Sequence, residues 1–274
     1  HLLTDAALLR RANVASIDAL WDRVTSAPFL LHHSQRCDWS TRFRRAFPDG
    51  PAAIVAAAER ILLHEFDLLG SGPMRLGERL PWHADFKSGR TWPRRWCHDF
   101  DLNELDRPSD VKVPWELSRC QHLPLLGEAW WLTGDERFAR EFVAEIDDWI
   151  ESNPFAFGIN WACPMDVALR ALNWIWSLHF FADADACRNA EFRSRLLRVL
   201  YLHGEFIAAN PEMDEVNGNH YLSDAVGLVS LGVLFRPIAD ATRWLETGRR
   251  RVLVAAGAYH GAAPWCTPLP VGVV

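Results

Sequence analysis

The chain of 274 residues is 49% hydrophobic, which is enough for a sizeable core, and no Ser/Gly/Pro linker divides it. Its net charge of -6 argues against a nucleic-acid-binding protein, although a local cluster of Arg and His can still bind a polyanion. No run approaches the roughly 18 apolar residues of a membrane helix, so no membrane insertion is expected. The six cysteines lack zinc-ligand spacing, and we expect neither a metal nor a cofactor.

The first 113 residues are predicted to combine helices with a long irregular segment. Residues 1–65 are expected to hold N-terminal helices that pack on the main domain, the clearest of them at 51–64. Residues 66–113 show no clear period and are rich in Gly, Pro, Trp and charge. Such loops are usually functional or disordered, and the aromatic content argues against disorder. We therefore expect this loop to cover one mouth of the helical domain.

Residues 66–250 are predicted to form an all-α domain whose second half consists of helical hairpins. The expected helices cover 113–133 (kinked at Pro124), 135–150, 163–181, 191–209, 218–234 and 239–254. Helices with one apolar stripe alternate with helices that are apolar on most sides, as in a ring whose outer helices meet water. This alternation predicts an α/α toroid. A solenoid of helix pairs is the alternative, but no fixed-period repeat supports it.

Fourteen Trp residues are an unusual number, because each buried indole N–H needs an acceptor. Some of these rings are expected to line a cleft and stack on the apolar faces of sugars, with core packing as the alternative. The candidate substrate-binding residues of this kind and their polar neighbours are Trp82, His83, Asp85, Trp92 and Trp161. For those in the long loop, the alternative role is to anchor the loop to the helices.

A polar strip is predicted along the otherwise apolar helix 163–181. Asp166, Arg170, Asn173 and Ser177 recur at helical spacing and share one face. The strip is either a satisfied structural network with an Asp166–Arg170 pair or the wall of a water-filled cavity. We favour the cavity, with substrate binding by the first three residues, because charge in a core is costly unless it is paired.

Helix 218–234 repeats this pattern. Asn219, His220 and Asp224 cluster on one side, and Asp224 lies one turn from His220, where it could hydrogen-bond the imidazole and set its tautomer. A lone His is usually a satisfied core residue, but the neighbouring Asn and Asp favour a functional site. No GxSxG, HExxH or P-loop motif points to a serine hydrolase, a zinc protease or a nucleotide-binding protein.

Four segments resemble the N-terminal domain of the heparinase II/III-type lyases. They are LPWHADFKSGRTWP (80–93), DVKVPWELSRCQHLPLLGEAWWLTGDERFA (110–139), NPFAFGINWACPMDVALRALNWIW (153–176) and NGNHYLSDAVGLVSLGVLF (217–235). The resemblance implies an incomplete α/α toroid, followed in the family by a β-sandwich domain that we expect to be absent from this chain. It also implies cleavage of acidic polysaccharides by β-elimination.

The resemblance also implies roles for individual residues. Asn219 and His220 match the Asn-His element that neutralises the uronate carboxylate, so that the C5 proton becomes acidic. In the family a Tyr then acts as base or acid, helped in many members by a His of the β-domain. Tyr259-His260 echoes the family's Tyr-His pair, but it comes early and lacks the acidic and Ser context.

The sequence also leads to expectations about the C-terminal residues and about the location of the protein. Residues 251–274 are predicted to be an atypical tail, because the Ala/Pro/Val-rich end resembles neither a toroid nor a β-sandwich, and we expect a truncated or frame-altered end. The family resemblance favours a periplasmic or secreted protein, although no signal peptide is visible.

The leading hypothesis is a polysaccharide lyase domain whose partner is an acidic polysaccharide, such as a heparin-like glycosaminoglycan, alginate or a bacterial exopolysaccharide. Asn219 and His220 are the expected catalytic residues, Asp224 joins the substrate-binding set, and the truncated end could leave the chain inactive. One alternative is a non-catalytic glycan-binding fragment. Another is an inverting glycoside hydrolase that uses two carboxylates such as Asp85 and Glu116. The lyase hypothesis depends on the two polar helices facing a shared water-filled groove.

Overall fold

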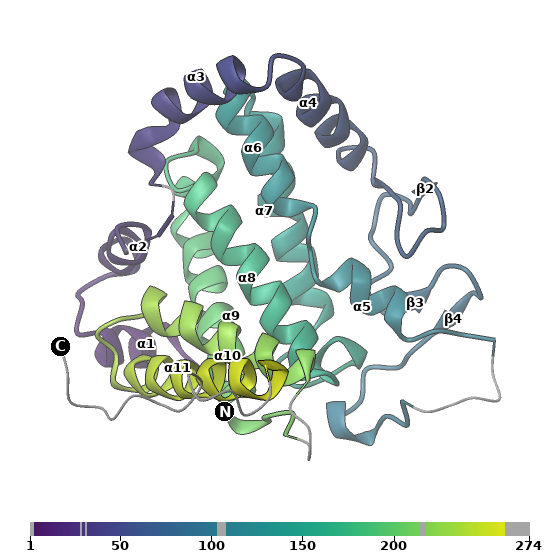
Figure 1. Ribbon diagram of the computed structural model, residues 1–274, viewed down its shortest axis with the longest axis vertical. Coiled ribbons are helices and arrows are strands. Elements are labelled where there is room, and N and C mark those ends of the chain that lie inside the picture. The colour runs from purple at the N-terminus through teal and green to yellow at the C-terminus, as the bar shows by residue number, and fades with distance from the viewer. Residues whose placement is uncertain (1–2, 28, 31, 103–107, 214–217, 261–274) are drawn as a thin grey trace.

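The computed structural model describes residues 3–27, 29–30, 32–102, 108–213 and 218–260, with side chains as far as residue 253. Helices dominate this part of the chain, as predicted, and they form an incomplete α/α toroid (Figure 1). Across the same residues, no helix is both long and apolar enough to cross a membrane.

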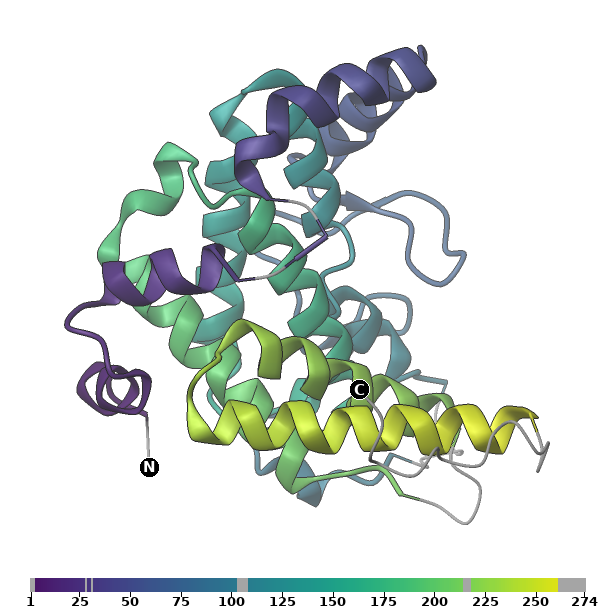
Figure 2. The same cartoon turned by 60° about the vertical axis from the view of Figure 1, so that its left-hand side comes forward.

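Consecutive helical hairpins build the toroid. They pair α6 (Leu123–Thr133) with α7 (Glu136–Ser152), α8 (Pro164–Phe180) with α9 (Ala190–Ala209), and α10 (Asn219–Leu234) with α11 (Ala239–His260). The inner helices α6, α8 and α10 contact one another in that order, α7 contacts α9, and α11 lies alongside α10 (Figure 2). Inner helices are covered on more sides than outer ones, which explains the alternation seen in the sequence.

The α6–α7 hairpin shows how the local sequence sets the helix ends. α6 ends at Gly134, whose φ of +76° lies in the left-handed region that favours glycine. Asp135 then caps α7, because its side chain accepts a hydrogen bond from the backbone N–H of Arg137. The apolar stripe that follows is fully buried and consists of Phe138, Phe142, Ile146 and Trp149.

One predicted helix is divided in two. Instead of a kinked helix over 113–133, the chain forms α5 (Lys112–Ser118) and α6, and Cys120 in the turn between them has a φ of +55°. Pro124 lies in the first turn of α6, where a missing N–H is tolerated, so it starts a helix rather than kinking one. The break allows α5 to contact α8 as a separate element.

The N-terminal helices contact the helices of the toroid. They are α1 (Asp5–Ala12), α2 (Ile17–Thr25), α3 (Arg36–Ala46) and α4 (Gly50–Ile61), with the short 3₁₀ helix η1 (His33–Gln35) before α3. α1 and α2 contact α9, whereas α3 and α4 contact α6 (Figure 1). The N-terminal segment therefore covers two different faces of the hairpins.

The long loop contains short strands. β1 (Glu65–Phe66) pairs antiparallel with β2 (Met74–Arg75), β3 (Ala84–Asp85) pairs antiparallel with β4 (Arg90–Thr91), and the 3₁₀ helix η2 (Cys97–Asp99) follows. β1 contacts α4 and β3 contacts α5, so the segment lies along one flank of the helices (Figure 1). Strands of two residues are too short to leave a detectable alternation in the sequence.

Glycines allow the inner helices to approach one another closely. A Cβ added to Gly227 of α10 would lie 2.8 Å from the Cβ of Ala168 on α8. One added to Gly127 of α6 would lie 2.5 Å from the Cβ of Phe180. Both distances are below van der Waals contact, so a larger residue would push the helices apart.

Candidate functional site

The amino ends of α8 and α10 meet, and the side chain of Glu212 connects them. Glu212 Oε2 accepts a hydrogen bond of 2.8 Å from the backbone N–H of Met165, in the first turn of α8. Its Oε1 lies 2.9 Å from Nδ1 of His220, in the first turn of α10. A carboxylate is stabilised at a helix amino end by the unpaired N–H groups there. The two helix starts therefore form one polar site.

Asn219 and His220 are the exposed part of this site. The His220 side chain is 46% exposed, and Asn219 is exposed beside it, with its Nδ2 4.0 Å from Sδ of Met165. A carboxylate accepts hydrogen bonds, so Nδ1 of His220 carries the proton that Glu212 binds. Nε2 of His220 is then left for a ligand. The pair predicted from the sequence thus reaches solvent at the positive end of the α10 dipole.

Asp224 has a different role from the one predicted. It is fully buried, its Oδ2 accepts a hydrogen bond of 3.0 Å from the backbone N–H of Glu212, and its Oδ1 has no partner among the described residues. Burial, reinforced by the charge of Glu212, raises the pKa of Asp224 to about 7. The expected Asp224–His220 hydrogen bond is replaced by the Glu212–His220 contact, because Asp224 lies one turn deeper, beneath the backbone of Glu212.

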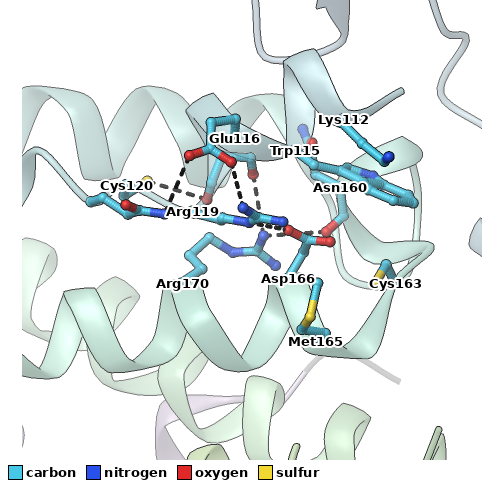
Figure 3. A network of polar contacts seen from close by, with 12 residues as sticks. Lys112, Trp115, Glu116, Arg119, Cys120, Asn160, Cys163, Met165, Asp166 and Arg170 are labelled. Carbon is cyan, nitrogen blue, oxygen red and sulfur yellow. Dashed lines mark hydrogen bonds and ion pairs between the residues drawn. The ribbon is translucent and has the colours of Figure 1, made fainter. Parts of the chain in front are cut away.

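Asp166 at the start of α8 also has an unexpected partner. Arg119, in the turn after α5, donates from Nε to Asp166 Oδ1 over 2.5 Å, and its Nη1 pairs with Glu116 (Figure 3). Asp166 is buried, and its Oδ2 has no partner within the described part of the chain. The Asp166–Arg170 pair, which was the alternative to the favoured cavity, is therefore replaced by a pair between Asp166 and Arg119. The break between α5 and α6, which the sequence did not reveal, brings Arg119 to Asp166.

Arg170 lies in solid aromatic packing and is fully buried. Its guanidinium carbon lies 4.2 Å from the ring centre of Trp149 and 5.3 Å from that of Trp161. A guanidinium group stacks well on indole rings, which supply attraction without a counter-ion. Arg170 is therefore a core residue, and it does not face a substrate.

The hydrogen-bond partners of Arg170 are neutral groups. Its Nε donates to Nε2 of His203 over 2.9 Å, and its Nη1 donates to Ser118 Oγ and to the carbonyl of Asn160, each over 3.2 Å. Burial lowers the pKa of Arg170 to about 10. Burial, together with the charge of Arg170, lowers the pKa of His203 far below its usual range, so His203 is neutral.

The polar strip of α8 is therefore a structural network rather than the wall of the favoured cavity. The Asn173 amide donates to the carbonyl of Arg119 over 2.8 Å, and Ser177 donates to the carbonyl of Asn173. Backbone carbonyls and neutral side chains bind most of these polar groups, whereas Oδ2 of Asp166 and Nη2 of Arg170 are buried without a hydrogen-bond partner among the described residues. The predicted water-filled groove between α8 and α10 is not formed along these helices, because Asp166, Arg170 and Asp224 are buried. Of the residues assigned to it, Asn219 and His220 at the amino end of α10 are exposed.

The candidate sugar-stacking tryptophans are buried. Trp82 donates from its indole N–H to Asp148 over 2.7 Å, and Trp161 donates to the carbonyl of Asn153 over 3.3 Å. Trp92 is buried as well, with the guanidinium of Arg90 stacked 4.7 Å from its ring centre. These rings pack within the fold, which was the alternative to sugar stacking.

His83 and Asp85 hold the loop in place. Asp85 is 2% exposed, and its carboxylate accepts hydrogen bonds from Ser88 Oγ and from the backbone N–H groups of Lys87, Ser88 and Asp110. Burial alone would raise the pKa of Asp85, but these hydrogen bonds lower it overall. Nε2 of His83 lies 2.9 Å from the carbonyl of Ser152. Asp85 therefore holds two parts of the loop together, and His83 anchors the loop to the end of α7.

The sequence reasoning missed Glu212, which holds the site together. Glu212 stands eight positions before His220 in a polar stretch, and no helical period relates the two. Cys163 joins them, since one possible ligand atom from each of the three residues lies within 4.8 Å of the others. Burial, together with the charges of Asp166 and Glu212, raises the pKa of the Cys163 thiol. Glu212 therefore brings a buried thiol and an exposed imidazole together at the amino ends of α8 and α10.

The described residues thus form a helical toroid domain with polar groups gathered at the amino ends of two inner helices. Residues 57–255 match the family model of the heparinase II/III N-terminus, and the chain belongs to this family.

Two curated relatives are both called heparin-sulfate lyase. The one from Pedobacter heparinus is 25% identical over 197 residues, which cover 70% of this chain and 26% of the relative. The one from Bacteroides stercoris is 24% identical over 160 residues, which cover 51% of this chain and 23% of the relative. The chain thus spans about a quarter of the length of these relatives.

Solved structures support the fold. Heparan sulfate lyase HepC from Pedobacter heparinus aligns with 93% of this chain and 34% of its own, at a TM-score of 0.59 and 20% identity. A heparinase III gene product aligns with 74% of this chain and 31% of its own, at a TM-score of 0.58 and 21% identity. The resemblance recognised in the sequence is confirmed.

Proposed function

We propose that the chain is the helical domain of a polysaccharide lyase that cleaves a uronate-containing glycosaminoglycan by β-elimination. The observation that carries the proposal is the exposed pair Asn219–His220 at the amino end of α10, with His220 held by Glu212. The names of the relatives, heparin-sulfate lyases, direct the choice of substrate class.

The chemistry requires donors placed where negative charge develops. Removal of the C5 proton of a uronate puts charge on its carboxylate, and this charge is stabilised by preorganised hydrogen-bond donors. The Asn219 amide and the amino end of α10 supply such donors. Glu212 fixes the tautomer and the ring orientation of His220, whose Nε2 can then contact the sugar.

The group that removes the C5 proton is not assigned. Tyr259 and His260 lie in α11, and their side chains are outside the described ones. Residues 261–274, for which a truncated or frame-altered end was predicted, also lie outside the described residues. The proposal therefore concerns binding and neutralisation of the uronate by this domain, with proton transfer by a further group.

The structure weakens the hydrolase alternative. Inverting hydrolysis needs one carboxylate to activate water and a second to protonate the leaving group. The carboxylate of Asp85 is buried and holds a turn through hydrogen bonds from Ser88 and Asp110, so it cannot activate water without breaking the loop. A non-catalytic glycan-binding role uses the same Asn219–His220 surface and is kept as the second candidate.

Incubation with heparan sulfate, heparin, alginate and a neutral glucan tests the proposal. Elimination creates an unsaturated uronate that absorbs in the ultraviolet, whereas hydrolysis creates reducing ends without this absorbance. We expect absorbance to grow with the heparin-type substrates. Binding without cleavage would favour the glycan-binding candidate, and new reducing ends without absorbance would overturn the lyase proposal.

Variants then test the residues. Asn219→Ala should lower the rate by about a hundredfold or more, because it removes a hydrogen-bond donor at the developing charge. His220→Ala should lower the rate to a similar extent, because it removes the imidazole whose Nε2 is oriented towards the sugar. His33→Ala is the matched control, since His33 lies in η1 and makes no contact with the site. Rates near those of the unmodified chain in folded Asn219 and His220 variants would remove the pair from the mechanism.

A further inference from the structure

A second cluster of titratable side chains lies away from the proposed lyase site, where the segment after α4 meets α7. It consists of His64, Glu141 and Glu145, and one possible ligand atom from each lies within 4.8 Å of the others. His64 Nε2 is 2.9 Å from Glu141 Oε1. We propose that these three side chains bind a divalent transition-metal ion of the Zn²⁺ type, which fastens the start of the long loop to the toroid.

The orientation of His64 is that of a metal ligand. Its Nδ1 lies 2.6 Å from the carbonyl oxygen of Gly77, and because a carbonyl only accepts, Nδ1 carries a proton. Nε2 then points at the carboxylates. Imidazole ligands of metals usually donate their other N–H to a carbonyl or carboxylate in this way. His64 has a φ of +50°, in the left-handed region that few non-glycine residues adopt, so the turn after α4 fixes the direction in which its side chain leaves the backbone.

Glu145 supplies the independent observation that points to a cation. Its side chain is only 3% exposed, its Oε2 lies 2.6 Å from Nε2 of His122, and its Oε1 is buried without a hydrogen-bond partner among the described residues. A buried carboxylate oxygen without a donor is destabilising. A cation between Oε1 and Nε2 of His64 would remove this penalty.

The helix geometry concentrates negative charge at the same place. Glu141 and Glu145 are four residues apart on α7, so they share one face and repel each other. A cavity of about 250 Å³ opens beside them and is also lined by Glu78, Arg79 and Asp148. The Arg79 guanidinium is turned to Asp148, with Nη2 3.4 Å from Oδ1. The cavity leaves room for a water molecule as the fourth ligand of a tetrahedral ion.

The donor set selects the type of metal. One imidazole nitrogen and two carboxylate oxygens suit Zn²⁺ and its transition-metal neighbours, whereas Ca²⁺ and Mg²⁺ prefer oxygen ligands alone. A proton on Nε2 of His64 is the alternative to a metal ion between His64 and the two carboxylates. The hydrogen bond to Glu141 favours this proton, since it raises the pKa of His64 to about 9. A titration with metal separates these two states.

The test uses the whole chain after treatment with a chelator. Calorimetric titration with Zn²⁺ should show one ion bound per chain, with a matching rise in Tm, because binding to the folded state alone stabilises it. Glu145→Gln keeps the volume and an acceptor for His122 but removes the charge, and it should weaken binding by at least about tenfold. Glu141→Gln, at a half-buried position, is the second variant in case Glu145→Gln fails to fold.

Two controls make the outcome specific. Glu151→Gln changes an acid on the same helix whose side chain is 77% exposed, and it should leave Zn²⁺ binding unchanged. His220→Ala removes one member of the Cys163–Glu212–His220 cluster and should also leave binding unchanged, so the result is independent of the proposed lyase function. Co²⁺ binding should give a visible spectrum without a thiolate charge-transfer band.

Three results would overturn the proposal. The first is a chain that binds no Zn²⁺ at millimolar concentration. The second is loss of binding in His220→Ala with full binding in Glu145→Gln. The third is a thiolate band with Co²⁺, which would place the ion at Cys163.

Discussion

Replacement of Arg170 tests whether the buried guanidinium stabilises the fold by its contacts or mainly by the volume that it fills. The pKa of about 10, compared with 12.5 for free arginine, corresponds to a net penalty of about 3 kcal/mol for the charged form, in which burial outweighs the attraction of nearby groups such as Asp166. Its hydrogen bonds to His203, Ser118 and the Asn160 carbonyl are favourable by about 1 kcal/mol each. These two effects nearly cancel.

Arg170→Met should therefore cost little, because it keeps most of the volume and removes a charge that burial disfavours. We expect a loss of about 1 kcal/mol in the free energy of unfolding. Arg170→Ala should cost about 3–5 kcal/mol, because it also leaves a cavity between Trp149 and Trp161. Urea unfolding followed by Trp fluorescence measures both values. If Met proves as destabilising as Ala, the contacts of the guanidinium outweigh its desolvation, and the reasoning fails.

Further predictions concern pH, helix packing and the candidate site. Burial lowers the pKa of His179 to about 4, compared with about 6.5 in the unfolded chain. The unfolded chain therefore takes up a proton at this residue before the folded chain does, and acid destabilises the fold. The free energy of unfolding should fall by about 1.4 kcal/mol per pH unit between pH 6 and 4. His179→Gln should remove the contribution of His179 to this fall in urea titrations at several pH values, while the contribution of the buried His203 remains, and an unchanged slope would contradict the assignment. Gly127→Ala should cost about 1–3 kcal/mol, because its methyl group would collide with Phe180, and an unchanged Tm would refute that reasoning. Glu212→Gln should lower the lyase rate about tenfold or more by loosening His220 while leaving Tm nearly unchanged; equal rates would separate Glu212 from the site.

The helices of the toroid could be predicted because each depends on a local pattern. The stripe at Phe138, Phe142, Ile146 and Trp149 and the cap at Asp135 define α7 within a single stretch of sequence. The division of 113–133 into α5 and α6 could not be predicted in the same way. Apolar residues run through both helices, and the turn depends on a positive φ at Cys120, a conformation that cysteine does not favour by itself.

The candidate site was predicted in part. Asn219 and His220 were singled out by their shared helix face, the family resemblance gave them a catalytic role, and both are exposed at the start of α10. The buried residues assigned to substrate binding, such as Arg170 and Trp82, were assigned from helical faces and aromatic content. Neither the helical spacing nor the aromatic content shows whether a face meets water or another helix. In the sequence, a polar strip within a packed network therefore cannot be distinguished from a polar strip that lines a cleft.

The sequence alone determined the helical period, the helix caps and the family to which the chain belongs, because these are carried by neighbouring residues or by contiguous motifs. Only the tertiary structure decided which side chains meet across helices. Glu212 bridges Met165 and His220, and His64 meets Glu141 from 77 positions away. The expectation of no metal came from cysteine spacing, and such spacing carries no information on the cluster of His64, Glu141 and Glu145, for which we propose a metal ion.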